Sequence, residues 1–172
     1  MHVGKQLHFN HKFIKFHFLE VSMDTRMSEE ERQVFLAETR VGIISIPEEG
    51  RGPLTVPVWY TYQPGGTVCV WTGIKTRKAR LLQKARRISF CFQDTTPPNY
   101  NYVSVEGPFT IQPVDLERDI HPMALRYYGP ENGEYLYADI GKNDSWKDDI
   151  LVCITPDRWL TVDYSKMGPP PK

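Results

Sequence analysis

Three short apolar runs separated by turn-forming residues constrain this chain to a largely antiparallel β fold. The runs cover residues 41–46, 54–62 and 67–71, and the connections 47–53 and 63–66 are rich in glycine and proline. Connections this short join antiparallel strands, because a parallel pair needs a crossover of about a dozen residues or more. The sequence therefore predicts a succession of β-hairpins in this part of the chain.

The later part of the chain continues this pattern with further extended segments. Strands are predicted over 87–93, 100–111, 149–155 and 158–163, the last two as a hairpin around Pro156 and Asp157. Gly107 indicates a bulge or bend within its strand. Closing six or seven such strands into a barrel would remove their exposed edges. We therefore expect a mainly β fold, a barrel with peripheral helices.

Helices are predicted at three places around this barrel. Ser28 and Glu31 form a capping box, which starts a helix that runs to about residue 39. A short basic helix is expected over 76–84. Residues 115–128 and 131–140 are predicted to be helical on either side of Gly129 and Pro130, with Gly133 interrupting the second segment.

One folded domain is expected over residues 23–166, a length that suffices for a substantial core. Residues 1–22 hold four of the five histidines and four phenylalanines without metal-type spacing. We interpret them as an extension derived from upstream sequence, disordered or exchanged onto a neighbouring molecule. Residues 167–172 are predicted to be a loose, proline-rich tail.

Positive charge is concentrated in the middle of a chain whose net charge is zero. No aspartate or glutamate occurs between Gly50 and Gln93, whereas that window contains eight lysines and arginines. Several of them flank the start of the predicted basic helix, where unpaired backbone N–H groups and the helix dipole favour anions. The pattern predicts a phosphate site there; the alternative is a solvated basic surface.

The usual catalytic motifs are missing, which leaves a bound organic cofactor as the natural carrier of any chemistry. The sequence has no Gly-x-Ser-x-Gly, His-Glu-x-x-His or Cys-x-x-Cys motif, and only His121 lies in the predicted domain. We expect no metal site and no assigned catalytic side chain. The zero net charge argues against nucleic acid as a partner, and no apolar run approaches the roughly 20 residues of a membrane span.

Pro57 interrupts the second strand next to Trp59 and Tyr60. A proline cannot complete a β-ladder, so the freed N–H and C=O groups beside these aromatic residues could bind the rim of a flat heterocycle. The alternative is an ordinary bulged strand. The three cysteines, Cys69, Cys91 and Cys153, lie in apolar strand-like runs, and we expect them to be buried, reduced thiols in a cytoplasmic protein.

Five motifs in order resemble the pyridoxamine 5'-phosphate oxidase-like split-barrel flavoproteins, also called the flavin/deazaflavin oxidoreductases. They are Val56-Pro-Val-Trp-Tyr60, Trp71-Thr-Gly73, Thr76-Arg-Lys78, Arg87-Ile-Ser-Phe90 and Tyr102-Val-Ser-Val-Glu-Gly107. The resemblance covers about residues 29–166. It implies a six-stranded antiparallel split β-barrel that forms a homodimer with the cofactor at the interface.

The resemblance also implies an activity and a binding site. The activity is hydride transfer between a bound cofactor, FMN or alternatively deazaflavin coenzyme F-420, and a small organic substrate. The chain lacks the carboxyl-terminal Arg-Leu-x-Pro-type signature of true pyridoxamine-phosphate oxidases, so that reaction is not expected. A non-catalytic flavin- or haem-binding protein remains the alternative. The implied cofactor-binding residues are Val56, Pro57, Val58, Trp59, Trp71 and Thr72 for the ring, and Lys75, Thr76, Arg77 and Lys78 for the phosphate.

Overall fold

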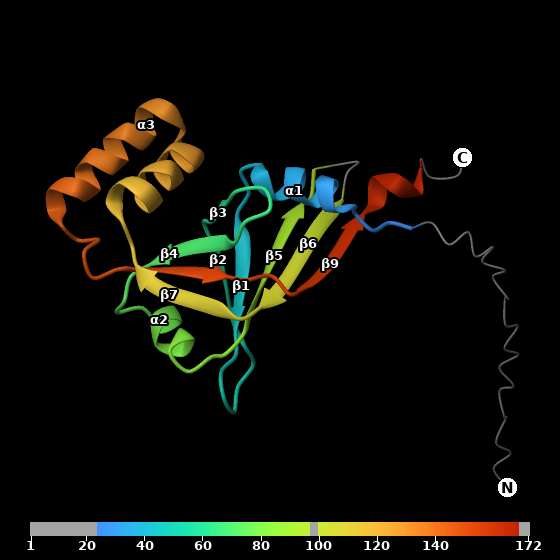
Figure 1. Ribbon diagram of the computed structural model, residues 1–172, viewed down its shortest axis with the longest axis horizontal. Coiled ribbons are helices and arrows are strands. Elements are labelled where there is room, and N and C mark those ends of the chain that lie inside the picture. The colour runs from blue at the N-terminus through green and yellow to red at the C-terminus, as the bar shows by residue number, and fades with distance from the viewer. Residues whose placement is uncertain (1–23, 97–99, 169–172) are drawn as a thin grey trace, which may run out of the picture.

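Nine strands form two antiparallel sheets in this computed structural model, which describes residues 24–96 and 100–168 (Figure 1). The first sheet has the strand order β2-β1-β5-β6-β9 and the second β3-β4-β8-β7. The strands are β1 (Gly42–Ile46), β2 (Leu54–Val58), β3 (Thr61–Tyr62), β4 (Val68–Thr72), β5 (Ile88–Asp94), β6 (Asn101–Gly107), β7 (Phe109–Pro113), β8 (Ile150–Ile154) and β9 (Arg158–Asp163).

The main core consists of inward-facing side chains from both sheets. In β1 and β5 every second residue is buried, as expected for strands with one face against a core. β8 differs, because all five of its residues are buried. One face of β8 belongs to the main core, and Leu151 and Cys153 on the other face join a second cluster with Val114 and Ile120. The continuous apolar sequence of β8 follows from this burial on both faces.

The helices lie around the sheets. α1 (Glu29–Ala37) begins with the predicted capping box, in which the Ser28 hydroxyl accepts from the Glu31 N–H and the Glu31 carboxylate accepts from the Ser28 N–H. α2 (Arg77–Leu82) follows β4. The π-helical turn η1 (Leu116–Ile120) leads into α3 (His121–Asn143), and a 3-10 helix η2 (Tyr164–Met167) ends the described chain. Figure 1 shows α3 beside the ends of β4 and β7.

The prediction of a mainly β chain with peripheral helices is confirmed, but the details of the sheets differ. Nine strands in two sheets replace the six predicted, and no closed barrel is found among the described residues. The predicted hairpin of the last two strands is wrong: β8 pairs with β4 and β7, whereas β9 pairs with β6 in the other sheet. The predicted strand 100–111 is divided at Pro108 into β6 and β7, one in each sheet.

α3 contains the break predicted at Gly129 and Pro130. Gly129 has a φ of 77° and a ψ of 174°, outside the helical region, and this conformation kinks the helix. Gly133 is not an interruption, contrary to the prediction, because it lies within the helix. A Cβ atom there would lie 2.8 Å from the Leu125 Cα, so glycine at this position lets the two halves of α3 approach closely.

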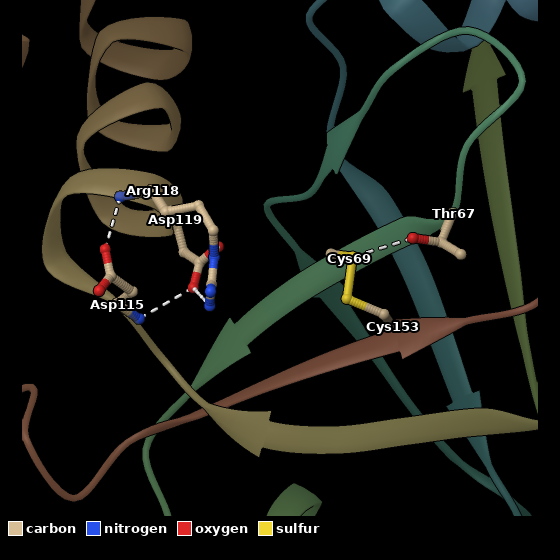
Figure 2. The surroundings of a disulfide bond; sticks show 6 residues. All are labelled: Thr67, Cys69, Asp115, Arg118, Asp119 and Cys153. Atoms are coloured by element: carbon tan, nitrogen blue, oxygen red, sulfur yellow. Dashed lines mark hydrogen bonds and ion pairs between the residues drawn. A yellow bond between two sulfur atoms is a disulfide. The ribbon is translucent and has the colours of Figure 1, made fainter.

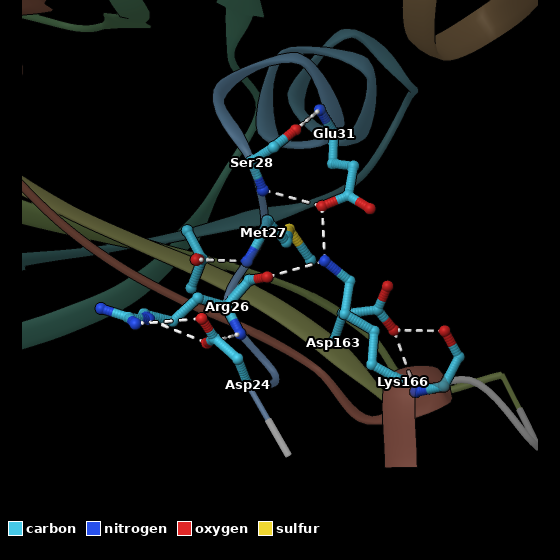
Figure 3. A network of polar contacts seen from close by, with 9 residues as sticks. Asp24, Arg26, Met27, Ser28, Glu31, Asp163 and Lys166 are labelled. Carbon is cyan, nitrogen blue, oxygen red and sulfur yellow. Dashed lines mark hydrogen bonds and ion pairs between the residues drawn. The ribbon is translucent and has the colours of Figure 1, made fainter. Parts of the chain in front are cut away.

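The first described residues are tied to the last ones (Figure 3). The Asp163 N–H donates to the Thr25 carbonyl at 2.7 Å, and the Met27 N–H donates to the Thr161 hydroxyl at 2.9 Å. Lys166 Nζ donates to the Glu31 carboxylate at 2.6 Å. The chain is therefore part of the fold from Thr25 onward. The extension predicted over 1–22 lies outside the described residues. Of the tail predicted over 167–172, Met167 instead ends η2, and the part from residue 169 lies outside the described residues.

The prediction of three reduced cysteines is wrong for two of them. Cys69 in β4 and Cys153 in β8 face each other in the strand register and form a disulfide (Figure 2). No local pattern indicates this pairing, because the two cysteines are separated by 84 positions. Cys91 is free and half-buried, and burial raises the pKa of its thiol. None of the helices in 24–96 and 100–168 has the length and apolar character needed to cross a bilayer.

Candidate functional site

The candidate site begins at the gap between β2 and β3, where Trp59 and Tyr60 leave the sheet. The predicted strand 54–62 is broken there, two residues after Pro57, which still pairs in register with Ile43. β2 is the edge strand of its sheet, so the absence of an N–H on Pro57 costs little. Tyr60 is fully buried, whereas Trp59 is 37% exposed. The break therefore presents the Trp59 ring at the surface.

A tyrosine from α3 fills the gap in the backbone ladder. The Tyr60 N–H donates to the Tyr127 hydroxyl at 2.9 Å, and this hydroxyl lies 2.7 Å from the Arg40 carbonyl and 3.2 Å from the Tyr60 carbonyl. The backbone N–H and C=O of Tyr60 therefore have partners within the chain, so of the two interpretations of the break the structure favours the ordinary irregular strand at Tyr60. Burial raises the pKa of the Tyr127 hydroxyl, so it remains a neutral donor and acceptor at neutral pH.

Tyr127 also fixes the orientation of Trp59. The two rings stack with centroids 4.8 Å apart and an interplanar angle of 10°, and Tyr128 meets Trp59 edge-on at 5.3 Å. Such pairs contribute about 0.5–1.5 kcal/mol beyond their buried area. The Trp59 ring is thus held by α3, a helix far away in the sequence.

We expect Tyr127→Phe to lower the free energy of unfolding by about 1–3 kcal/mol, because it leaves the buried Tyr60 N–H without a partner while keeping the ring stack. Urea denaturation followed by Trp fluorescence measures the change. Tyr135→Phe is the matched control, because Tyr135 is 70% exposed. An equal effect of both substitutions would contradict this account of the break.

A cavity of about 460 Å³ lies beside Trp59. Five of the ten predicted cofactor-binding residues line it, from β2, the β2–β3 gap, β4 and α2. Val41 and Met123, which the sequence analysis missed, complete its wall. The lining residues are Val41, Pro57, Val58, Trp59, Trp71, Lys78 and Met123.

Trp71 is held in place by an ionic partner. Its indole Nε1–H donates to Asp149 Oδ2 at 2.8 Å, and the ring is half-buried against the second cluster. Asp149 directly precedes β8, whose residue Leu151 is the register partner of Trp71. The indole ring is therefore fixed at the cavity by two neighbouring strands.

Lys78 brings an uncompensated positive charge to the cavity wall. The side chain is half-buried on α2, and burial lowers the pKa of its ammonium group. Within residues 24–96 and 100–168 no carboxylate lies within ion-pair distance of it. Burying a charge without a partner is costly, so an anionic group bound beside Lys78 would recover the lost interaction.

The other predicted residues do not line this cavity. Thr76 caps α2: its hydroxyl accepts from the Ala79 N–H at 3.2 Å and donates to the Gly73 carbonyl at 2.8 Å. Arg77 forms an ion pair with Glu48. Lys75 is exposed, Val56 is half-buried and Thr72 is buried.

The segment between Gly50 and Gln93, which contains no aspartate or glutamate, has more of its positive charge neutralised in the structure than its sequence suggests. Arg77 pairs with Glu48 from just before the window, and Arg87 forms two hydrogen bonds with Asp157, at 2.6 and 2.7 Å. Both acids come from outside the window. The positive charge available to a ligand in the cavity is therefore mainly that of Lys78.

His121 is not positioned as a haem ligand in this cavity. Its Nε2 lies 2.8 Å from the Glu134 carboxylate, and its ring lies against Tyr137. Among the described residues His121 is the only histidine, and it is not one of the cavity's lining residues.

Solved structures show what the fold resembles. A conserved hypothetical protein, Rv2991 of Mycobacterium tuberculosis, is 27% identical with a TM-score of 0.71, over 87% of this chain and 92% of that one. An F420 reductase is 16% identical with a TM-score of 0.58, over 74% of this chain and 94% of that one. A putative pyridoxamine 5'-phosphate oxidase from Listeria innocua is 12% identical with a TM-score of 0.54, over 77% and 96%.

Sequence comparison adds nothing to these structural matches. No protein-family model matches the chain. No curated protein sequence matches it either.

Proposed function

We propose, from the premise that this chain has the split-barrel fold of the flavin and deazaflavin oxidoreductases, that it is an oxidoreductase using a flavin-type cofactor. The cofactor would be FMN or, alternatively, the deazaflavin coenzyme F-420. When bound, it supplies hydride transfer to or from a small organic substrate. The cavity at Trp59, Trp71 and Lys78 is the proposed binding site.

The observation that carries this proposal is an unpaired, half-buried cation in a cavity walled by aromatic and apolar side chains. Trp59 and Trp71 offer flat surfaces, and Pro57, Val58 and Met123 add apolar side chains to the wall. A planar ring that bears anionic groups matches both features. The residues present therefore fit a flavin-type cofactor.

Three lining residues, and three residues outside the lining, have definite tasks in this proposal. Trp59, stacked on Tyr127, orients the ring at low entropic cost because its own ring is already fixed. Trp71 is fixed in the same way through Asp149. Lys78 contributes the charge that holds an anionic group, and Lys75, Thr76 and Arg77 at the start of α2 remain the predicted contacts of the phosphate.

A homodimer with the cofactor at the interface is part of the proposal. Pro57 and Trp59, which line the cavity, are both exposed, and β2 is the edge of its sheet. A second copy could cover this side and exclude water from the ring. Light scattering of the protein at several concentrations tests for the dimer.

Lys78→Gln is expected to weaken cofactor binding roughly 10- to 100-fold, because one charge-assisted contact is worth roughly 1.5–3 kcal/mol. Titration with FMN and, separately, coenzyme F-420, followed by absorbance, gives the dissociation constants. Lys84→Gln is the control, because Lys84 is exposed and outside the cavity lining. No spectral change of either cofactor with the wild-type chain would contradict the proposal, as would equal affinities of the two variants.

Non-catalytic binding of the same cofactor is the second candidate. It is favoured by the fact that Lys78 is the one ionisable side chain among the described lining residues. Reduction of the bound cofactor by a donor, with turnover of an organic acceptor, supports the oxidoreductase. Tight binding without reduction by any donor tested supports the binding protein.

A further inference from the structure

The disulfide between Cys69 and Cys153 has two chemically different ends. Cys153 is 7% exposed and packs in the second cluster with Val114, Ile120 and Leu151. Cys69 is half-buried, and its residue forms part of the wall of a second cavity of about 370 Å³. A molecule that enters this cavity therefore meets Cys69, whereas Cys153 is buried and is not one of the described lining residues.

This second cavity is separate from the one at Trp59 and lies between the β3–β4 hairpin and the start of α3. The two cavities have no lining residue in common. Its wall is polar on the α3 side, where two arginines contribute, and it contains the disulfide on the β4 side. The lining residues are Thr61, Tyr62, Gln63, Gly66, Thr67, Cys69, Arg118, Pro122 and Arg126.

The charges around the cavity favour an anion. No carboxylate is among its described lining residues. Arg118 is paired with the buried Asp119, as Figure 2 shows. The Arg126 guanidinium instead donates to three main-chain carbonyls at the end of α1, so its charge is not cancelled by a carboxylate. The two charged side chains that line the cavity are thus both cations, whereas the carboxylates beside Arg118, those of Asp115 and Asp119, lie outside the described lining.

A hydroxyl lies beside the accessible sulfur. Thr67 Oγ1 is 3.3 Å from Cys69 Sγ, and Thr67 is exposed (Figure 2). A hydroxyl at this distance can donate to a sulfur that carries partial negative charge during exchange. A disulfide cysteine, a neighbouring hydroxyl donor and two cationic side chains therefore meet in the wall of one cavity.

We propose that Cys69 is a thiol–disulfide exchange site that takes a small anionic thiol. The thiolate attacks Cys69 Sγ, the bond to Cys153 Sγ breaks, and a mixed disulfide forms on Cys69 while the proton of the incoming thiol ends on Cys153. A second thiol molecule that attacks the mixed disulfide leaves both cysteines reduced and releases the two thiols as one disulfide. Two electrons thus pass from the thiols to the protein.

The asymmetry between the two sulfurs provides the test. In a Cys91→Ser background, Cys153→Ser leaves Cys69 as the one thiol, and Cys69→Ser leaves Cys153. With oxidised glutathione as the probe, intact-mass measurement should show the Cys69 thiol forming the mixed disulfide at least roughly tenfold faster than the Cys153 thiol. Equal rates, or faster reaction at Cys153, would overturn the proposal.

The wild-type chain gives the same answer if a variant fails to fold. After limited incubation with reduced glutathione and acid quenching, peptide mapping should find the glutathione adduct on Cys69. Adducts mainly on Cys153, or none at any glutathione concentration that leaves the fold intact, would overturn the proposal.

Charge selection is tested separately with one substitution in the cavity. Arg118→Gln should slow glutathione addition roughly threefold or more, because it leaves the Asp119 charge uncompensated beside the cavity. The matched control is Arg158→Gln on β9, which also loses a surface ion pair, with Glu106, but lies outside the cavity lining. With cystamine, a cationic disulfide, as the probe, the Arg118→Gln variant should instead react faster than the Arg158→Gln variant. Identical rates for both variants and both probes would refute an anion-selective site.

Discussion

Gly107→Ala is expected to lower the free energy of unfolding by more than about 4 kcal/mol, or to prevent folding altogether. A Cβ atom on Gly107 would lie 2.0 Å from the Thr155 carbonyl oxygen and 3.0 Å from the Thr155 carbonyl carbon. Both are main-chain atoms, so no side-chain rotation relieves the overlap.

The surrounding main chain has little freedom to move away from residue 107. The Thr155 N–H donates to the Pro108 carbonyl at 2.8 Å, and the Asp157 N–H donates to the Glu106 carbonyl at 3.1 Å. Any displacement that makes room for a methyl group lengthens these two hydrogen bonds, which join the end of β6 to the connection between the two sheets. No backbone movement can therefore relieve this overlap without weakening these hydrogen bonds.

Thermal and urea unfolding measure this effect. Gly52→Ala is the control, because a Cβ atom there has no neighbour within 4 Å, and its effect should stay within about 0.5 kcal/mol. A Gly107→Ala protein whose stability lies within about 1 kcal/mol of the wild type would contradict the close approach of the Thr155 main chain to Gly107.

Phe92→Ala is expected to cost about 3–5 kcal/mol of unfolding free energy. Phe92 is fully buried in β5, and its ring centroid lies 4.4 Å from that of Tyr60, next to the β2–β3 break. Removing the ring leaves a cavity at the centre of the main core and withdraws the support of Tyr60.

Gly42 provides a sharper form of this experiment. A Cβ atom on Gly42 would lie 2.6 Å from Phe92 Cε1, so Gly42→Ala alone should be destabilising. In the Phe92→Ala background the same methyl group enters empty space. The double variant should therefore be more stable than the sum of the two single changes predicts, and additive effects would contradict the packing described here. Urea denaturation of the four proteins completes the cycle.

The sequence predicted most elements whose signals are local. The capping box at Ser28, the extended segments that form β1 and β5 and the helix break at Gly129 all depend on residues that are neighbours in the chain. Pairings between distant segments could not be read in this way. The assignment of β8 to one sheet and β9 to the other is such a pairing, and so is the disulfide between Cys69 and Cys153.

The candidate site shows the same division. Trp59, Trp71 and Lys78 lie in three of the sequence motifs and are predicted cofactor-binding residues, and the structure places them at one cavity. Met123 and Tyr127 were missed, because no feature of a helix sequence indicates which strand break it will cover. The absence of aspartate and glutamate between Gly50 and Gln93 suggested more unpaired positive charge than the structure contains. Glu48 and Asp157, which lie outside this segment in the sequence, form ion pairs with two of its arginines.

The contact between Thr25 and Asp163 has a consequence for engineering this protein. Because the backbone hydrogen bond between them brings the first and last described segments together, the fold is suited to circular permutation. A short linker could join these segments, and new ends could open in the exposed turn between β3 and β4, around Gly65. The order of the strands along the chain would change, while both sheets and the cavity at Trp59 would keep their neighbours.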